Sequence, residues 1–391
     1  MSGRAVVVLS LAAFASAAAL RAADPLLPLL AEAFGTSAGG ASAVISAFAV
    51  AYGVLQVVNG PLSERIGKYR MVFWVTAISA AGNLACALAP SLPLLVAARF
   101  ATGATVGAIV PLAMAWIGDT VPYERRQPVL ARFLIGNMLG VALATTASGW
   151  LGELYGWRAI FFALAGLYVV TASLLWFELR TNPATRQAAS AGESIAQAFV
   201  RMIRLTRLPW VRVILLTVFA EGVLLNGPLA FAAYHVHRYL GLGIAASGAL
   251  VAAFAGGGLL YAAIAGRLVP RLGERGLVLA GALFIGAGYA GLALAPGPAY
   301  AVPCLLALGA GLYMLHNTLQ VNATQMAPES RGAAVALFAF CLFGGQSAGV
   351  WLASQVVDAV GTRPVFAIAA VGLPLLAFNF RRLLAARRAA G

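Results

Sequence analysis

Long apolar runs recur from one end of this 391-residue sequence to the other, and they limit the folds that it can adopt. About 20 consecutive apolar residues are enough to cross the hydrocarbon core of a bilayer. Hydrophobic residues make up 62% of the chain and charged residues only 10%, too few to cover the surface of a soluble protein of this size. The sequence therefore predicts an all-α membrane protein that crosses the bilayer many times.

A window of that length places twelve transmembrane helices along the chain. The predicted spans are residues 5–32, 38–58, 70–90, 92–117, 128–151, 159–179, 210–235, 244–265, 276–295, 298–321, 332–356 and 364–382. The segment Met1–Ala23 also matches a signal peptide, with Arg4 ahead of an apolar stretch. We predict a retained first helix, because the apolar run continues to Leu30 and because the repeat described below requires a helix here.

Basic residues predict the orientation of the chain. The formal net charge is +14, which in a soluble protein would suggest a nucleic-acid partner. Here most of the 26 Lys and Arg residues lie in the segments that are inside if the N-terminus is cytoplasmic, as the positive-inside rule requires. The opposite side would hold only Arg158, Arg238 and Arg363. We therefore expect both termini in the cytoplasm and no nucleic-acid partner.

The longest polar segment divides the predicted spans six and six. It predicts two helix bundles, residues 1–180 and 210–391, joined by a cytoplasmic linker at 181–209. Within the linker, Ser194–Leu208 interleaves apolar residues such as Phe199 with Arg201 and Arg204, a pattern that favours a basic helix lying on the anionic inner leaflet. A flexible tether is the alternative.

An internal repeat relates the two bundles. The segments Gly60–Gly67 and Gly266–Gly273 share Gly, Leu, Arg and Gly at an offset of 206 residues. The matches at an offset of 205 are Gly140 with Gly345, Gly156 with Gly361, Arg158 with Arg363 and Phe161 with Phe366. This collinear series predicts two parallel six-helix repeats related by an axis along the membrane normal, with a substrate site between them near the middle of the membrane.

Three segments resemble the major facilitator superfamily. Gly60–Arg70 closely resembles the signature between the family's second and third helices, with Glu64 in place of the usual Asp. Leu95–Gly103 resembles the signature of the fourth helix, with Thr102 where Gln is usual. Arg21–Pro28 resembles the first helix of drug and metabolite efflux members, the arabinose-efflux-like group of twelve-span proton antiporters.

One departure bears on the direction of transport. The fifth-helix signature of the antiporters carries a proline, and the corresponding segment Gly140–Gly149 has Thr145 at that position. The resemblance implies a secondary transporter of the bacterial inner membrane, driven by a proton gradient and without a cofactor. The missing proline weakens its implication of export over import.

The segment Gly60–Arg70 also predicts a cytoplasmic latch. Its carboxylate, Glu64, can pair with a nearby Arg or with the positive N-terminus of a neighbouring helix. The resemblance places that helix at the start of the eleventh span, near Gly332. The predicted latch residues are Gly60, Glu64, Arg65, Gly67, Arg70 and Asp119. Alternatively, the arginines serve only as positive-inside determinants. The second copy has Pro270 in place of the acid, so we expect a weak latch or none there.

Four charged residues lie deep inside predicted spans, more than five residues from either end, where they are costly and functional by default. They are Arg21, Asp24, Arg99 and Glu221. Glu221 lies near mid-membrane without a basic neighbour in its own helix, so burial favours its protonated form and predicts a proton-coupling residue, with Asp24 second. The alternatives are a hydrogen bond from Glu221 to Asn226 or His316, and a structural Asp24–Arg99 pair that holds spans one and four together.

Polar, aromatic and thioether side chains inside the spans are candidates to line the substrate cavity. They are Tyr52, Gln56, Asn137, Met138, Phe219, Asn226, Tyr313, His316, Asn317 and Gln346. No metal site is expected, because His235 and His237 point apart on a helix and the three cysteines lie in apolar runs without a metal-binding spacing.

The leading hypothesis is export of a small amphipathic drug or metabolite by proton antiport. The alternative is proton-coupled uptake of a small metabolite, for which Arg21 and Arg99 would suit an anion. The sequence contains no His-Glu-x-x-His metal motif and no Gly-x-Ser-x-Gly nucleophile motif, so we do not expect an enzyme, and it contains no phosphate-binding Gly-x-x-x-x-Gly-Lys-Ser/Thr motif. The expected partners are the small-molecule substrate and membrane lipids, with the protein acting as a monomer.

Overall fold

The computed structural model describes residues 3–186 and 194–390, and this part of the chain is built from helices without strands. The first half contains α1 (Gly3–Arg21), η1 (Asp24–Leu26), α2 (Leu27–Phe34), α3 (Ala38–Ala41), α4 (Ala43–Val54), α5 (Gln56–Ile66), α6 (Lys68–Leu88), α7 (Leu92–Val106), α8 (Ile109–Thr120), α9 (Tyr123–Tyr155), α10 (Arg158–Thr181) and η2 (Pro183–Thr185). The second contains α11 (Ile195–Leu205), α12 (Pro209–Glu221), η3 (Gly222–Asn226), α13 (Gly227–Leu229), α14 (Ala232–Leu240), α15 (Ile244–Val251), α16 (Ala253–Leu294), α17 (Pro298–Gln325), η4 (Pro328–Ser330), α18 (Arg331–Val360) and α19 (Thr362–Ala390).

The described residues supply helices for twelve membrane crossings, the number predicted. By length and composition the described residues hold 10 candidate spans, or 11 when the bent pair Ala38–Val54 and Gln56–Ile66 is one span. One of these, Ile244–Leu294, is 51 residues long, about 76 Å of helix, and a bilayer core is only about 30 Å thick. It is broken at Gly273, whose φ of 59° and ψ of 178° are not helical, so it crosses twice.

The segment Gly60–Arg70 is less of a loop than predicted. Helix α5 continues to Ile66 after a 51° bend from α4, so most of the segment is helical. Gly67 alone makes the turn into α6, with a φ of 93° that favours glycine.

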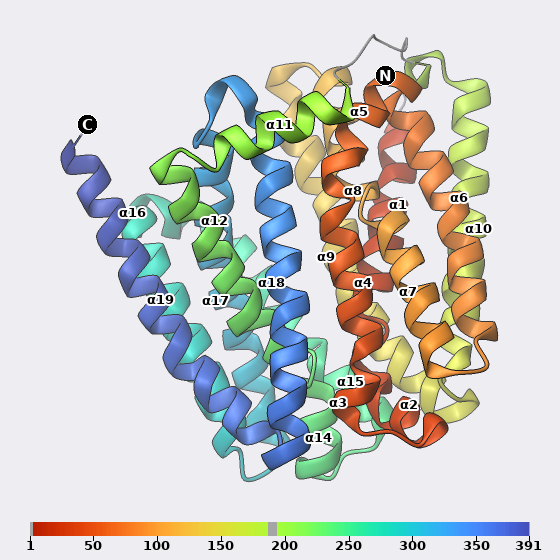
Figure 1. Cartoon of the computed structure of the whole chain (residues 1–391), viewed down its shortest axis with the longest axis vertical. Coiled ribbons are helices and arrows are strands. Elements are labelled where there is room, and N and C mark those ends of the chain that lie inside the picture. The colour runs from red at the N-terminus through yellow and green to blue at the C-terminus, as the bar shows by residue number, and fades with distance from the viewer. Residues whose placement is uncertain (1–2, 187–193, 391) are drawn as a thin grey trace.

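Both termini and α11 lie at the same end of the bundle, while α3, α14 and α15 lie at the other (Figure 1). Helix α11 begins with a capping box between Ser194 and Gln197 and contacts α5 and α18, one from each half. Its Met202 is buried and its Phe199 exposed. The central part of the predicted linker, residues 187–193, lies outside the described residues.

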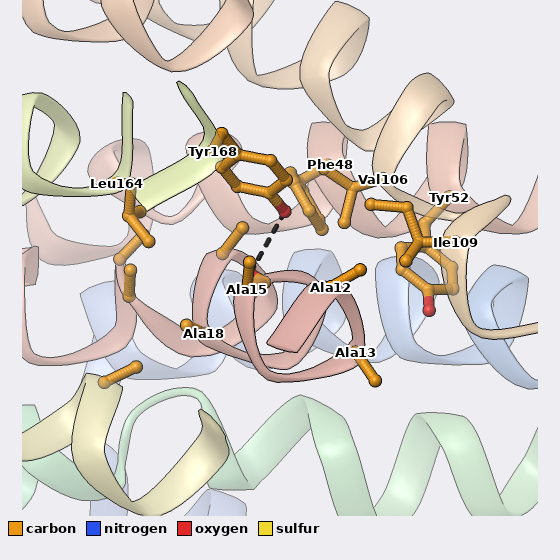
Figure 2. Close-up of a cluster of buried hydrophobic side chains, with 14 of the residues drawn as sticks. Ala12, Ala13, Ala15, Ala18, Phe48, Tyr52, Val106, Ile109, Leu164 and Tyr168 are labelled. Atoms are coloured by element: carbon orange, nitrogen blue, oxygen red, sulfur yellow. Dashed lines mark hydrogen bonds between the residues drawn. The ribbon is translucent and has the colours of Figure 1, made fainter. Parts of the chain in front are cut away.

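Buried apolar side chains form two large clusters, one mainly from residues 5–175 and one from residues 202–384. Helix α1 crosses the first cluster on a face of alanines, which lets neighbouring helices approach closely (Figure 2). There the Tyr168 hydroxyl donates a hydrogen bond to the Ala15 carbonyl at 3.0 Å, so the buried phenol is not left without a partner.

The same glycine-mediated crossing occurs in both halves. A Cβ on Gly140 of α9 would lie 2.3 Å from the Phe14 carbonyl oxygen of α1, and a Cβ on Gly345 of α18 would lie 2.2 Å from the Phe219 carbonyl oxygen of α12. Gly140 and Gly345 are 205 residues apart, and so are Phe14 and Phe219, which is the offset found in the sequence. Small residues at such crossings are how membrane helices pack without a hydrophobic driving force.

Replacing Gly345 with alanine is therefore expected to destabilise the protein by about 2 kcal/mol, because the added methyl group forces α12 and α18 apart. Thermal unfolding in detergent measures the loss. Gly166→Ala is the matched control, since that helical glycine has open space around its Cβ position and should be neutral. Equal unfolding midpoints for the two variants would contradict the close-packing interpretation.

Candidate functional site

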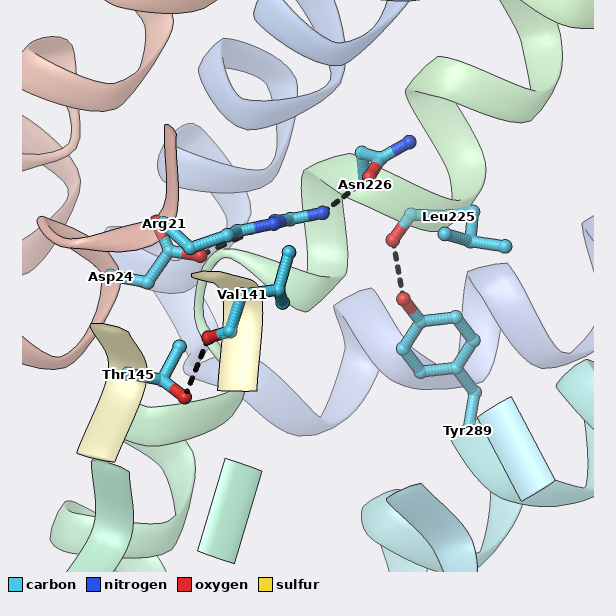
Figure 3. A network of polar contacts seen from close by, with 7 residues as sticks. All are labelled: Arg21, Asp24, Val141, Thr145, Leu225, Asn226 and Tyr289. Carbon is cyan, nitrogen blue, oxygen red and sulfur yellow. Dashed lines mark hydrogen bonds and ion pairs between the residues drawn. The ribbon is translucent and has the colours of Figure 1, made fainter. Parts of the chain in front are cut away.

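A buried polar chain connects the two halves of the bundle (Figure 3). Arg21, the last residue of α1, contacts the Asp24 carboxylate at 3.3 Å and donates a hydrogen bond to the Asn226 side-chain oxygen at 2.7 Å. Arg21 is 7% exposed and Asp24 2% exposed. The partner of Arg21 in its own half is therefore Asp24, and its partner in the other half is Asn226.

Asn226 lies at the end of η3, a short π-helical segment that follows Glu221. Such insertions widen a helix and are frequent at functional sites. Buried Tyr289 of α16 donates a hydrogen bond to the Leu225 carbonyl within this segment (Figure 3). Tyr289, which belongs to the same half, thus fixes the π-helical segment, and the Asn226 side chain at its end contacts Arg21 of the other half.

Thr145 stands where the antiporter signature has proline. Its hydroxyl donates to the Val141 carbonyl of its own helix at 3.3 Å (Figure 3), and α9 runs without a break from Tyr123 to Tyr155. A proline at this position would remove a backbone hydrogen bond and bend the helix. The missing proline therefore leaves α9 continuous beside the polar chain.

Arg99 is fully buried and makes no direct ion pair with Asp24. Its Nη1 donates to the Ala19 carbonyl at 3.1 Å and its Nε to the Val44 carbonyl at 3.3 Å, and its guanidinium lies 4.0 Å from the centre of the Phe48 ring. Arg99 thereby links span four to spans one and two through backbone carbonyls, and not through the Asp24 carboxylate.

Glu221 is fully buried and hydrogen-bonded within the C-terminal half. Its Oε2 lies 2.9 Å from His316 Nδ1 of α17, and its Oε1 has no hydrogen-bond partner among the described residues. The His316 side chain is 19% exposed. Of the two partners weighed from the sequence, His316 is the one that Glu221 contacts.

The remaining cavity candidates differ in their burial and in their contacts. Gln56 donates to the Gly107 carbonyl at 2.7 Å and so serves packing within the first half. Tyr52 lies at the seam, with its ring centre 4.2 Å from that of Phe343 in α18. Buried Gln346 has an Nε2 without a partner among the described residues. The half-buried candidates are Asn137, Met138, Tyr313 and Asn317, and Phe219 is 40% exposed.

The predicted cytoplasmic latch is not closed in this structure. Glu64, Arg65 and Arg70 are exposed, and the described residues provide no ion pair to Glu64. Asp119 pairs instead with Lys68, at the start of α6.

The two histidines near the other end of the bundle have separate partners. His235 Nδ1 lies 2.6 Å from the Thr362 hydroxyl, and His237 Nδ1 lies 2.8 Å from the Leu242 carbonyl oxygen. They do not converge on a common point.

Two carboxylates at the end of the bundle opposite the termini were missed from the sequence. Asp358 of α18 accepts hydrogen bonds from the Gly39 backbone N–H at 2.9 Å and the Ser37 hydroxyl at 2.7 Å. Glu153 of α9 accepts one from the Ala245 backbone N–H at 2.6 Å. Both contacts join the two halves. The repeat could have revealed them, because residues 153 and 358 are also 205 apart.

Comparisons with known proteins agree with this architecture. The YgaY protein of Escherichia coli (strain K12), a putative uncharacterized transporter, is 29% identical over 174 residues, which cover 44% of this chain and 43% of YgaY. The uncharacterized MFS-type transporter YceJ of Bacillus subtilis (strain 168) is 25% identical over 344 residues, 84% of this chain and 83% of YceJ. The multidrug export protein EmrB of E. coli is 27% identical over 156 residues, 40% of this chain and 30% of EmrB. The chain thus matches less than half the length of YgaY and of EmrB.

A solved structure shows the same fold over nearly the whole chain. The crystal structure of a D-xylose-proton symporter superposes with a TM-score of 0.77 at 17% identity, covering 96% of this chain and 97% of the symporter. The model of the Major Facilitator Superfamily matches residues 9–350, which include the helices of both halves that carry Arg21, Asn226 and Glu221. The chain therefore belongs to the Major Facilitator Superfamily, and it is a multi-pass membrane transporter and not an enzyme.

Proposed function

We propose that this protein exports a small amphipathic drug or metabolite by proton antiport, as a monomer in the bacterial inner membrane with both termini in the cytoplasm. The observation that carries the coupling to protons is Glu221, a fully buried carboxyl group hydrogen-bonded to partly exposed His316. The similarity to EmrB, which is named a multidrug export protein, supports export.

The Glu221–His316 pair is suited to take up and release a proton. With Glu221 ionised, a neutral imidazole donates from Nδ1 to the carboxylate, which leaves Nε2 free to accept a proton. His316 is partly exposed while Glu221 is not, so the imidazole is the group that meets water first. A proton accepted there neutralises the buried negative charge, which is costly to keep away from water.

The Arg21–Asn226 hydrogen bond supplies a connection that movement of the halves must break. It joins α1 to η3, and η3 follows directly on Glu221. Charge changes at Glu221 and separation of the halves therefore act on the same short segment. We propose that this is how proton loading alters access to a central substrate site.

Transport in proteoliposomes with an imposed pH gradient tests the proposal. Candidate substrates come from a thermal-shift screen of metabolites and drugs, since a ligand that binds the folded state raises its stability. Proton movement opposite to substrate supports antiport. Substrate movement that ignores the pH gradient would overturn it.

The second candidate is proton-coupled uptake of a small anion. It is favoured by Arg21, a buried cation at the seam between the halves, and by Thr145 in place of the antiporter proline. The same vesicles distinguish the two functions, because uptake requires that proton and substrate move in the same direction.

Glu64→Gln is expected to shift the protein towards the conformation of this structure, in which Glu64 is exposed and unpaired among the described residues. Loss of a charge–helix contact in the other conformation corresponds to about a fivefold change in population. Cysteine accessibility at the cytoplasmic ends of α5 and α18 measures it. Glu32→Gln, which removes an exposed carboxylate of α2 at the opposite end of the bundle, is the control. Wild-type accessibility in Glu64→Gln would leave this segment as a topology signal only.

A further inference from the structure

The contacts of Glu153 and Asp358 are one contact that occurs twice. Asp358, near the end of α18, receives the Gly39 N–H, and Glu153, near the end of α9, receives the Ala245 N–H. The two carboxylates are 205 residues apart, and Gly39 and Ala245 are 206 apart. These are the offsets of the internal repeat. In one copy the carboxylate belongs to the C-terminal half and the N–H to the N-terminal half, and in the other copy the two are reversed.

Each carboxylate meets backbone N–H groups that a helix cannot satisfy itself. Ala245 lies in the first turn of α15, where the N–H groups have no partner within the helix. Gly39 occupies the corresponding place in α3. A carboxylate is the strong acceptor for such a donor, because the bond is charge-assisted.

The backbone at both contacts lies close against the carboxylate. A Cβ on Gly39 would lie 2.3 Å from Asp358 Oδ2, and a Cβ on Gly243 would lie 3.2 Å from Glu153 Oε2. Beside the second contact, Gly248 of α15 packs against the Thr145 carbonyl of α9, with a Cβ distance of 2.4 Å. The two halves therefore touch closely at this end of the bundle.

We propose that Glu153 and Asp358 are reciprocal gating residues, which together hold the end of the transporter opposite the termini closed. Both are exposed to solvent, and exposed charge contacts are weak enough to break in each transport cycle. Opening this end moves α18 away from α3 and α9 away from α15, so both contacts break in the same motion (Figure 1). The assignment does not depend on the substrate, the direction of transport or the coupling ion.

Spin-label distances between the two halves test the proposal. Labels at Tyr155 and Val360, which are 74% and 67% exposed, lie next to the two carboxylates and in opposite halves. The background carries alanine at the three native cysteines, Cys86, Cys304 and Cys341. Pulsed electron paramagnetic resonance on the full-length protein in detergent then gives the ratio of open to closed molecules.

Glu153→Gln and Asp358→Asn are each expected to raise the open-to-closed ratio about fivefold, because each variant keeps the side-chain volume and removes the charge. The double variant should raise it about 25-fold, since two separate contacts that break in one motion multiply. Gly39→Ala should match Asp358→Asn, because its methyl group displaces the Asp358 carboxylate and leaves its charge.

Two control variants separate gating from general effects of charge or volume. Glu32→Gln removes an exposed carboxylate of α2 near the same end, and Gly297→Ala adds a methyl group where nothing lies within 4 Å. Both should keep the wild-type distance distribution. A double variant Glu153→Gln, Asp358→Asn with the wild-type distribution, or with a shift no larger than that of Glu32→Gln, would overturn the proposal.

Discussion

Glu221→Gln is expected to reduce proton-driven substrate accumulation to the level of protein-free vesicles, while exchange of substrate down its gradient persists. Glutamine keeps the shape and a hydrogen-bond acceptor for His316, so the protein should fold. It cannot change charge, and the buried site would then remain in a form that resembles protonated Glu221 at every pH. Without a change of charge at this site, the proton gradient cannot shift the conformational equilibrium.

Transport with and without an imposed pH gradient, in the same proteoliposomes, separates the two effects. His316→Gln is the companion variant and should slow proton-driven transport, because it removes the partly exposed group that meets water. Equal proton-driven transport by Glu221→Gln and the wild type would refute the assignment. If Asp24→Asn alone abolished coupling, the proton site would move to span one.

Arg21→Met is expected to lower the free energy of unfolding by about 3–5 kcal/mol, since it leaves the 2%-exposed Asp24 carboxylate without its cation. It also removes the hydrogen bond to Asn226 that joins the halves. Adding Asp24→Asn should restore much of the loss, because a neutral amide is far less costly to bury than an unpaired charge.

Thermal unfolding of the two single variants and the double variant in detergent gives the coupling between Arg21 and Asp24. Arg99→Met is the discriminating control. Arg99 binds the Ala19 and Val44 carbonyls, so Asp24→Asn should not rescue its loss. Rescue of Arg99→Met and not of Arg21→Met would show that Asp24 pairs with Arg99, the alternative that the sequence left open.

The sequence determined the transmembrane architecture. Hydropathy is a property of each segment, and a span needs only sufficient apolar length, so twelve crossings and their joints follow from the residues themselves. The repeat followed as well, because glycine crossings such as Gly140 with Phe14 and Gly345 with Phe219 keep their offset of 205 in both halves. The sequence also identified Arg21, Asp24 and Glu221 as candidate functional residues, since charged residues are rare inside a bilayer.

Only the tertiary structure decided which groups these residues meet. Arg21 contacts Asn226, 205 residues away, and Glu221 contacts His316, 95 residues away. Periodicity places a side chain on one face of its helix. Which residue it contacts depends on how the neighbouring helices are rotated and how they cross in the packed bundle. Asp358 shows the same limit. One of the two groups that donate to its carboxylate is the Gly39 backbone N–H, and every residue except proline has such a donor. The physical reason is that hydropathy sums over a segment, whereas a hydrogen bond depends on the position of two single atoms that only the packed bundle fixes.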